Sequence, residues 1–73
     1  METSQSKEDY IKAIWELTQD EQGVQRVRIA EHLGVSAPSV TAALHRLEKE
    51  GFAAADENGR VCLTERGRHI AEK

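Results

Sequence analysis

Hydrophobic residues recur every three or four positions along much of the chain, which is the spacing of one face of an α-helix. The first stretch with this spacing covers residues 6–20. Its apolar face consists of Tyr10, Ile11, Ile14, Trp15 and Leu17. Ser6 can accept a hydrogen bond from the free N–H groups at the start of a helix. The pattern therefore predicts a helix that begins at Ser6 and ends in the polar run 20–23.

Two shorter helices are predicted in the centre of the chain. Residues 28–33 place apolar side chains on one side of a helix, and Gly34 can adopt the left-handed conformation that ends it. The next helix is predicted over about 37–50, because Ser36 can cap it and Pro38 suits its first turn. Its buried stripe consists of Val40, Ala43, Leu44 and Leu47.

Three segments are predicted to be extended. Residues 24–27 are interpreted as a brief strand. Residues 52–55 and 61–63 flank the dipeptide Asn58-Gly59, which is typical of hairpin turns. Because alanine is a poor strand residue, the assignment of 52–55 depends on this turn.

The order of the predicted elements defines the fold class. After the hairpin, Thr64 can cap a last helix over 65–72. Two short helices joined by a turn that contains glycine form a helix-turn-helix, and the hairpin beside them is a wing. We therefore predict a mainly α-helical fold with a small β-hairpin, a winged helix-turn-helix. It forms a single domain over residues 1–73, with residues 1–5 loose.

Length and composition limit the function further. The chain has 73 residues, of which 38% are hydrophobic, and this supports one thin core. No apolar run approaches the roughly 20 residues that span a bilayer, and no secretory signal is visible, so we expect a cytoplasmic protein without membrane contact. The single Cys62 excludes an internal disulfide. No Ser/His/Asp or Cys/His arrangement is convincing, so we do not expect an enzyme.

The net charge of −3 is unusual for a protein that binds nucleic acid, because DNA-binding domains are usually basic. Residues 1–23 carry two basic and six acidic side chains, a net charge of −4. Residues 24–73 carry eight basic and seven acidic side chains, a net charge of +1. The acidity belongs to the first segment, so it does not exclude DNA binding by the rest.

The predicted helix over 37–50 has an outer face that suits the major groove of DNA. Burial of its apolar stripe leaves Ser39, Thr41, Ala42, His45, Arg46 and Lys49 on the outside. Hydroxyl groups and Arg side chains can bind base edges and phosphates. Arg26 and Arg28 are expected to contact phosphate, and Arg60 at the hairpin tip the backbone or the minor groove. These residues predict sequence-specific binding of double-stranded DNA.

A protein partner is the alternative to DNA. The outer face of this helix is not strongly basic, because Glu48 and Glu50 offset its two cations. A winged helix that binds another protein through Ala37 and Ala42 would have the same elements.

Four segments carry a further signal. They are SKEDYIKAIWEL at 6–17, VRIAEHLGVSAPSVT at 27–41, LEKEG at 47–51 and VCLTERGR at 61–68. Together they resemble the N-terminal domain of the metal-dependent DtxR/MntR repressors, over about residues 5–72. The last segment also recurs in MarR-like regulators, so a MarR-like regulator without metal sensing is a further alternative.

The resemblance implies a cytoplasmic transcription repressor whose metal-loaded homodimer binds a palindromic operator. The residues that match the base-facing start of the recognition helix are Ser36, Pro38, Ser39, Thr41 and Ala42. Arg26, Arg28 and Arg46 match positions that contact phosphate. Family members commonly have a polar or basic residue at Ala42. The dimerisation region would lie beyond residue 73.

The resemblance also implies a cofactor, Mn²⁺ or Fe²⁺, in a full-length member. Asp9 matches the one ligand that the first helix supplies. A carboxylate suits a hard ion such as manganese, whereas iron-type members more often have Met there. Lys12 stands where manganese-type members have a second acid. We therefore expect no metal on this chain alone and interpret Asp9 first as a helix-start charge, with a partial metal site as the second interpretation.

Overall fold

The computed structural model describes residues 7–19 and 23–72. These residues form four helices and one two-stranded antiparallel sheet. The elements are α1 (Lys7–Leu17), α2 (Arg26–Leu33), α3 (Ala37–Lys49), β1 (Ala53–Ala55), β2 (Val61–Leu63) and α4 (Glu65–Ala71). This order confirms the predicted winged helix-turn-helix.

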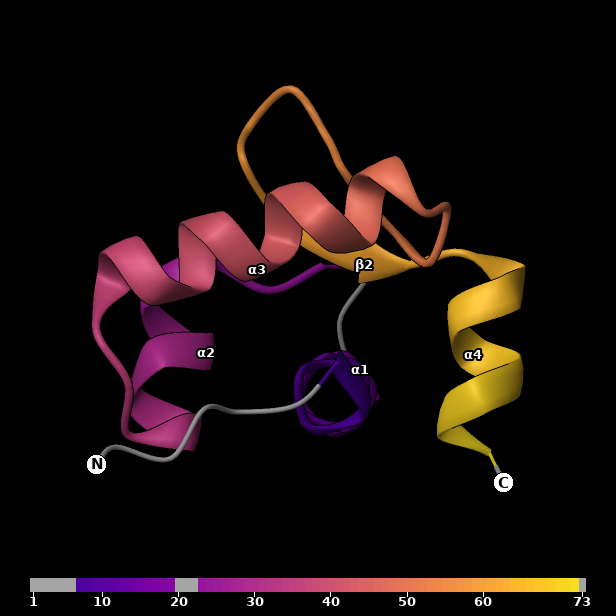
Figure 1. Cartoon of the computed structure of the whole chain (residues 1–73), viewed down its shortest axis with the longest axis horizontal. Helices are drawn as coiled ribbons and strands as arrows, with labels where there is room; N and C mark the ends of the chain where they lie inside the picture. Colours follow the sequence, from indigo (N-terminus) through magenta and orange to yellow (C-terminus); the bar gives the residue numbers. More distant parts are fainter. Residues whose placement is uncertain (1–6, 20–22, 73) are drawn as a thin grey trace.

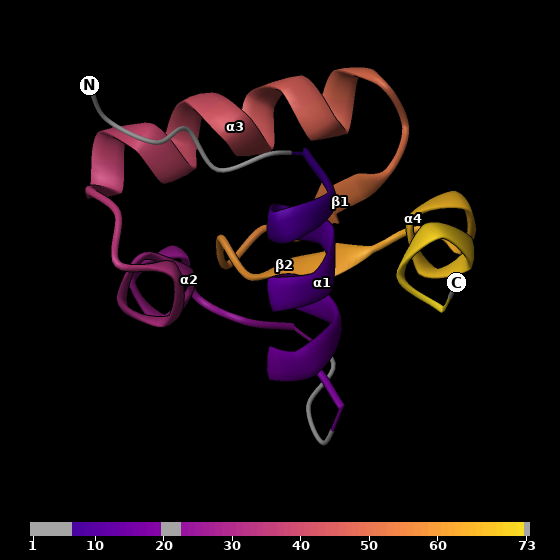
Figure 2. The same ribbon diagram turned by 60° about the horizontal axis from the view of Figure 1, so that its bottom comes forward.

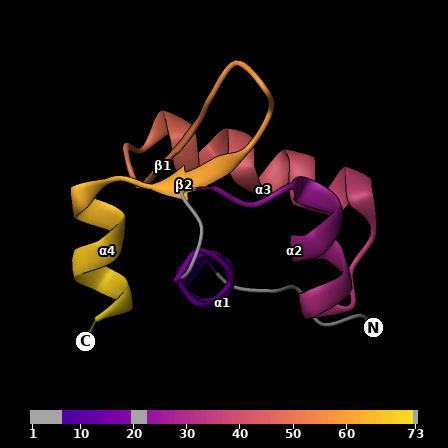
Figure 3. The same cartoon turned by 180° about the vertical axis from the view of Figure 1, so that it is seen from behind.

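Helix α1 lies at the centre of the molecule. It is packed between α2 and α4, as the views from opposite sides show (Figures 1 and 3). Helix α3 and the hairpin lie together above α1 in Figure 1, and Figure 2 shows α3 running across the N-terminal end of α1. The loop between the two strands extends beyond α3 as the wing (Figure 1).

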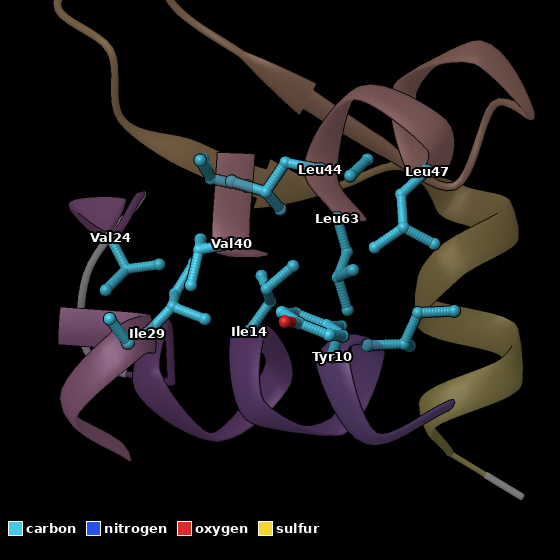
Figure 4. Close-up of a cluster of buried hydrophobic side chains, with 12 residues drawn as sticks. Tyr10, Ile14, Val24, Ile29, Val40, Leu44, Leu47 and Leu63 are labelled. Carbon is cyan, nitrogen blue, oxygen red and sulfur yellow. The ribbon is translucent and has the colours of Figure 1, made fainter. Parts of the chain in front are cut away.

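The core forms where these elements face one another (Figure 4). Its buried cluster consists of Tyr10, Ile11, Ile14, Val24, Ile29, Ala30, Val40, Leu44, Leu47, Ala53, Val61 and Leu63. The predicted apolar faces of α1, α2 and α3 all contribute to this cluster. Their outermost members are half-buried and pack against its edge: Trp15, Leu17, Leu33 and Ala43.

The strand predicted over 24–27 is reduced to a single bridge at Val24. Val24 alone pairs, through two backbone hydrogen bonds with Val61 of 2.9 and 2.8 Å. Gln25 is extended and occupies the N-cap position without a capping hydrogen bond from its side chain, and α2 begins at Arg26 rather than at the predicted residue 28. The apparent alternation of apolar and polar residues misled the interpretation, because Val27 lies on the outer side of α2 and is 54% exposed.

Helix α1 ends three residues before the predicted position. After Leu17, the Thr18 hydroxyl donates to the carbonyl of Ile14 at 2.6 Å, and the Gln19 amide donates to that of Trp15 at 3.0 Å. The Ile14 carbonyl also accepts from the backbone N–H of Thr18 at 3.0 Å, so the side chains of Thr18 and Gln19 supply additional partners for the last carbonyl groups of the helix. The predicted cap Ser6 and residues 20–22 lie outside the described residues.

The predicted hairpin is confirmed, and Asp56 holds its turn. Ala55 pairs with Val61, and the Asp56 carboxylate accepts hydrogen bonds of 2.9 Å from the backbone N–H groups of Asn58 and Arg60. Gly59 has a φ of 81°, a left-handed conformation that glycine adopts without strain. The turn chemistry thus compensates for the weak strand preference of the alanines.

Thr64 confirms its predicted role as the cap of α4. Its hydroxyl accepts a hydrogen bond from the N–H of Gly67 at 3.2 Å and donates to the carbonyl of Gly51 at 2.6 Å. Helix α4 ends at Ala71, one residue before the predicted end. Thr64 therefore joins the end of α3 to the start of α4.

At position 67 we expect glycine to give a more stable protein than alanine, although alanine is usually the better helix residue. By helix propensity alone, Gly67→Ala would raise stability by about 1 kcal/mol. A methyl group at this position would collide with the carbonyl oxygen of Phe52 and would lie 3.0 Å from the side chain of Leu63. We expect Gly67→Ala to lower the free energy of unfolding by about 1–3 kcal/mol in urea denaturation. Arg68→Ala, at the exposed neighbouring position, is the control and should not destabilise. A stabilised Gly67→Ala variant would contradict this packing.

Burial raises the pKa of Tyr10 above its ordinary value of 10.0. The core favours the neutral phenol, so the contribution of Tyr10 to stability is complete below pH ~10 and is lost as pH rises through the raised pKa. Tyr10 is the only tyrosine, so Tyr10→Phe isolates its effect. We expect the unfolding free energy of the wild type to fall more steeply above pH ~10 than that of the variant, by up to about 1.4 kcal/mol per pH unit. If the unfolding free energies of the wild type and of Tyr10→Phe change with pH in parallel, burial does not raise the pKa of Tyr10.

Candidate nucleic-acid interface

The turn between α2 and α3 is fixed by local hydrogen bonds. Gly34 has a φ of 70°, and its N–H and that of Val35 both donate to the carbonyl of Ala30, at 2.8 and 3.1 Å. Ser36 is extended and accepts a hydrogen bond from the N–H of Ser39 at 3.3 Å. The chain therefore reverses at Gly34 and starts α3 at a defined place, as predicted.

Helix α3 has one buried and one exposed side. Its fully buried residues are Val40, Leu44 and Leu47. The predicted contact residues Pro38, Ser39, Thr41, Ala42, His45, Arg46 and Lys49 are all exposed. At 3.6 residues per turn, Ala42 and Lys49 lie at the middle of the outer side. Arg46 lies toward α1, where it lines a small cleft of about 70 Å³ with Lys7 and Tyr10.

The other predicted basic residues come from two further elements. Arg26 and Arg28 lie in the first turn of α2 and are exposed. Arg60 is exposed at the end of the wing loop, where the carboxylate of Asp56 holds its backbone. Ser36 is also exposed, but its hydroxyl takes part in the cap and donates to the Ser39 hydroxyl at 2.9 Å.

An ion pair at the end of α3 is not indicated by the sequence pattern. The sequence predicts that Glu50 offsets Arg46 and Lys49, but its carboxylate contacts the Lys7 ammonium at 2.7 Å. The hydrogen bond and charge of Lys7, helped by the charges of Arg46 and Arg66, hold the pKa of Glu50 below its ordinary value. Lys7 and Glu50 lie far apart in the sequence, so no local pattern indicates the pair.

The described residues do not fit a metal site. Asp9 is exposed in the first turn of α1, and Lys12 on the same helix is a cation. Within residues 7–19 and 23–72, His, Cys, Asp and Glu side chains nowhere gather in a group of three that could hold an ion. His32 contacts Glu16 at 3.1 Å, an exposed pair that joins α2 to α1. No metal chemistry can be assigned to these residues.

A winged helix-turn-helix with one side of α3 exposed and basic residues on α2 and the wing is typical of DNA-binding domains. In the described part of the chain, no helix combines the length and hydrophobicity needed to cross a membrane. Residues 2–59 match the sequence family described as the iron dependent repressor, N-terminal DNA binding domain. The chain belongs to this family, whose members are transcriptional repressors rather than enzymes.

Individual relatives agree with the family match. The iron-dependent repressor IdeR of Mycobacterium tuberculosis is 38% identical over 66 residues, which are 88% of this chain and 28% of that protein. The metal-dependent transcriptional regulator MtsR has a similar structure, with a TM-score of 0.84 and 28% identity over 94% of this chain and 32% of that one. The manganese regulator SloR has a TM-score of 0.79 and 36% identity, over 94% of this chain and 32% of that one. The chain thus spans about a third or less of the length of each.

Family membership bears directly on the competing interpretations. It supports the DNA-binding domain of a repressor over a module that binds only protein and over a MarR-like regulator. The relatives named above are iron-dependent, manganese or metal-dependent regulators. None of them assigns a particular metal to this chain.

Proposed function

We propose that this chain is the DNA-reading domain of a metal-responsive transcriptional repressor. The observation that carries the proposal is the geometry of α3, whose apolar residues are fully buried while the predicted contact residues all remain exposed. In this arrangement α3 lies in the major groove, and the wing formed by residues 52–63 follows the adjacent backbone.

The proposed contacts fall into two groups. Ser36, Pro38, Ser39, Thr41 and Ala42 face base edges at the start of α3. Phosphate contacts come from Arg26, Arg28, His45, Arg46, Lys49 and Arg60. The Ser39 hydroxyl accepts a hydrogen bond from Ser36, which leaves its own hydrogen for a DNA acceptor. Ala42 contributes no hydrogen bond and can contact only a thymine methyl group.

The rest of the proposed function depends on sequence beyond this chain. The middle of the outer side of α3 offers few cations, so one copy of the domain is expected to bind weakly. A homodimer on a palindromic operator would double the contacts, and Mn²⁺ or Fe²⁺ would control that assembly in a cytoplasmic full-length protein. Asp9 is the residue that this chain would contribute to such a metal site.

The first test is a titration of the protein against a mixed-sequence duplex of roughly 30 base pairs. Binding through phosphates releases counterions, with a slope of about −0.9 in log K against log salt for each contact. We expect the affinity to fall by about tenfold or more between about 50 and 200 mM salt. Absence of binding at the lower salt concentration would reject the proposed function, as would an affinity that salt does not change.

A pair of variants separates phosphate binding from base reading. Sequences selected by the protein from a random duplex pool are compared with the unselected pool. Arg46→Ala should weaken binding to both by a similar factor, because phosphates carry no sequence information. Thr41→Ala should reduce mainly the preference for the selected sequences. Arg68→Ala on α4 is the charge control, and equal losses on both pools for both test variants would contradict the assigned roles.

A further inference from the structure

A cluster of four charged side chains and one aromatic ring joins the start of α1, the end of α3 and the start of α4, and only Arg46 in it is a predicted contact residue. It consists of Lys7, Arg46, Glu50, Phe52 and Arg66, which we call the junction cluster. Lys7 Nζ lies 2.7 Å from a Glu50 carboxylate oxygen and 5.3 Å from the centre of the Phe52 ring. The guanidinium carbon of Arg66 lies 4.8 Å from the same ring centre.

Arg46 connects this cluster to the recognition helix. It lies on the exposed side of α3 and lines the small cleft with Lys7. The charges of Lys7, Arg46 and Arg66 all lower the pKa of the Glu50 carboxylate, and of the three only Lys7 forms an ion pair with it. Lys7, Arg46 and Arg66 outnumber Glu50 within the cluster, and the acidic neighbours Glu8, Asp9 and Glu65 lie at its edge.

The cations of the junction cluster retain donors for another anion. In the described residues, neither Arg46 nor Arg66 forms an ion pair, and Glu50 binds only Lys7. The Arg66 guanidinium lies over the Phe52 ring, a contact that uses none of its five N–H donors in an ion pair and leaves them for a phosphate. The half-buried Phe52 ring also restricts both cations, so less conformational freedom is lost when a ligand binds.

The position of the cluster favours a DNA phosphate as that anion. Phosphate strands border the major groove on both sides, so a helix that lies in the groove has backbone near its flanks and ends. The junction cluster occupies the flank of α3 toward α1 and the C-terminal end of α3, where α4 begins (Figure 1). Of the described acidic residues of α1, Glu8 and Asp9 lie in its first turn beside Lys7, and Glu16 lies near the opposite end.

We propose that the junction cluster binds backbone phosphates beside the recognition helix, which extends the DNA interface to α1 and α4. The proposal rests on DNA binding by α3 and adds Lys7 and Arg66 to the contacts. In this arrangement the Glu50 carboxylate competes with phosphate for the cations of the cluster, Lys7 above all.

The decisive comparison is between Arg66→Gln and Arg68→Gln. Both variants remove one positive charge from an exposed position of α4, but only Arg66 belongs to the junction cluster. With the mixed-sequence duplex, Arg66→Gln should reduce the slope of log K against log salt by about 0.9, and Arg68→Gln should leave it unchanged. Arg66→Lys keeps the charge and should retain the slope. Circular dichroism and thermal unfolding of each variant exclude loss of the fold as the cause.

Glu50→Gln removes the anion of the cluster and keeps its cations, so it should raise the affinity for DNA where Arg66→Gln lowers it. It frees Lys7 and removes the competing carboxylate, so affinity for the duplex at low salt should rise several-fold. Glu72→Gln, at the end of α4, makes the same charge change away from the cluster and should have a smaller effect.

The outcomes separate this proposal from the proposed function. If the wild type binds the duplex and Arg66→Gln and Arg68→Gln have equal slopes, the junction cluster is not a contact, although the domain still binds DNA. An unchanged or weaker affinity of Glu50→Gln would also reject the cluster. If the wild type fails to bind at low salt, the proposed function fails, and the cluster proposal with it.

Discussion

The burial of one side of α3 is the constraint on which the rest of the structure depends. Val40, Leu44 and Leu47 are at most 2% exposed, because they fill the space between α1, α2 and the hairpin. Rotation of α3 about its axis would move these side chains into water and polar ones into the core, which costs free energy for every side chain exchanged. The outer side of α3 is therefore fixed by hydrophobic packing before any DNA contact is formed.

Two small pieces of local chemistry orient α3 within this packing. The left-handed Gly34 and the Ser36 cap set where the helix begins, and the Thr64 hydroxyl connects Gly51 to the start of α4. The close approach of Gly67 to Phe52 then brings Arg66 onto the Phe52 ring. The region of the proposed phosphate contacts at the end of α3 thus depends on residues that are not themselves charged.

The distribution of charge explains how an acidic chain can belong to a DNA-binding family. The net charge of −3 comes from the first 23 residues, whereas the remainder is slightly basic. Lys7 belongs to the acidic first segment, but its ammonium contacts Glu50 and neutralises this acid at the end of α3. The local field at the proposed interface is therefore more positive than the composition of α3 alone indicates.

By itself the sequence determined the helical faces, the caps at Ser36 and Thr64, the hairpin and the fold class, because these depend on spacing and on contacts between near neighbours. Tertiary structure alone decided that α2 begins at Arg26, since a single Val24–Val61 bridge replaces the expected strand. It also decided that Gly67 has no room for a methyl group and that Lys7, Glu50 and Arg66 meet. These features join residues that are distant in the chain, and local periodicity carries no information about which distant side chains the packed core brings together.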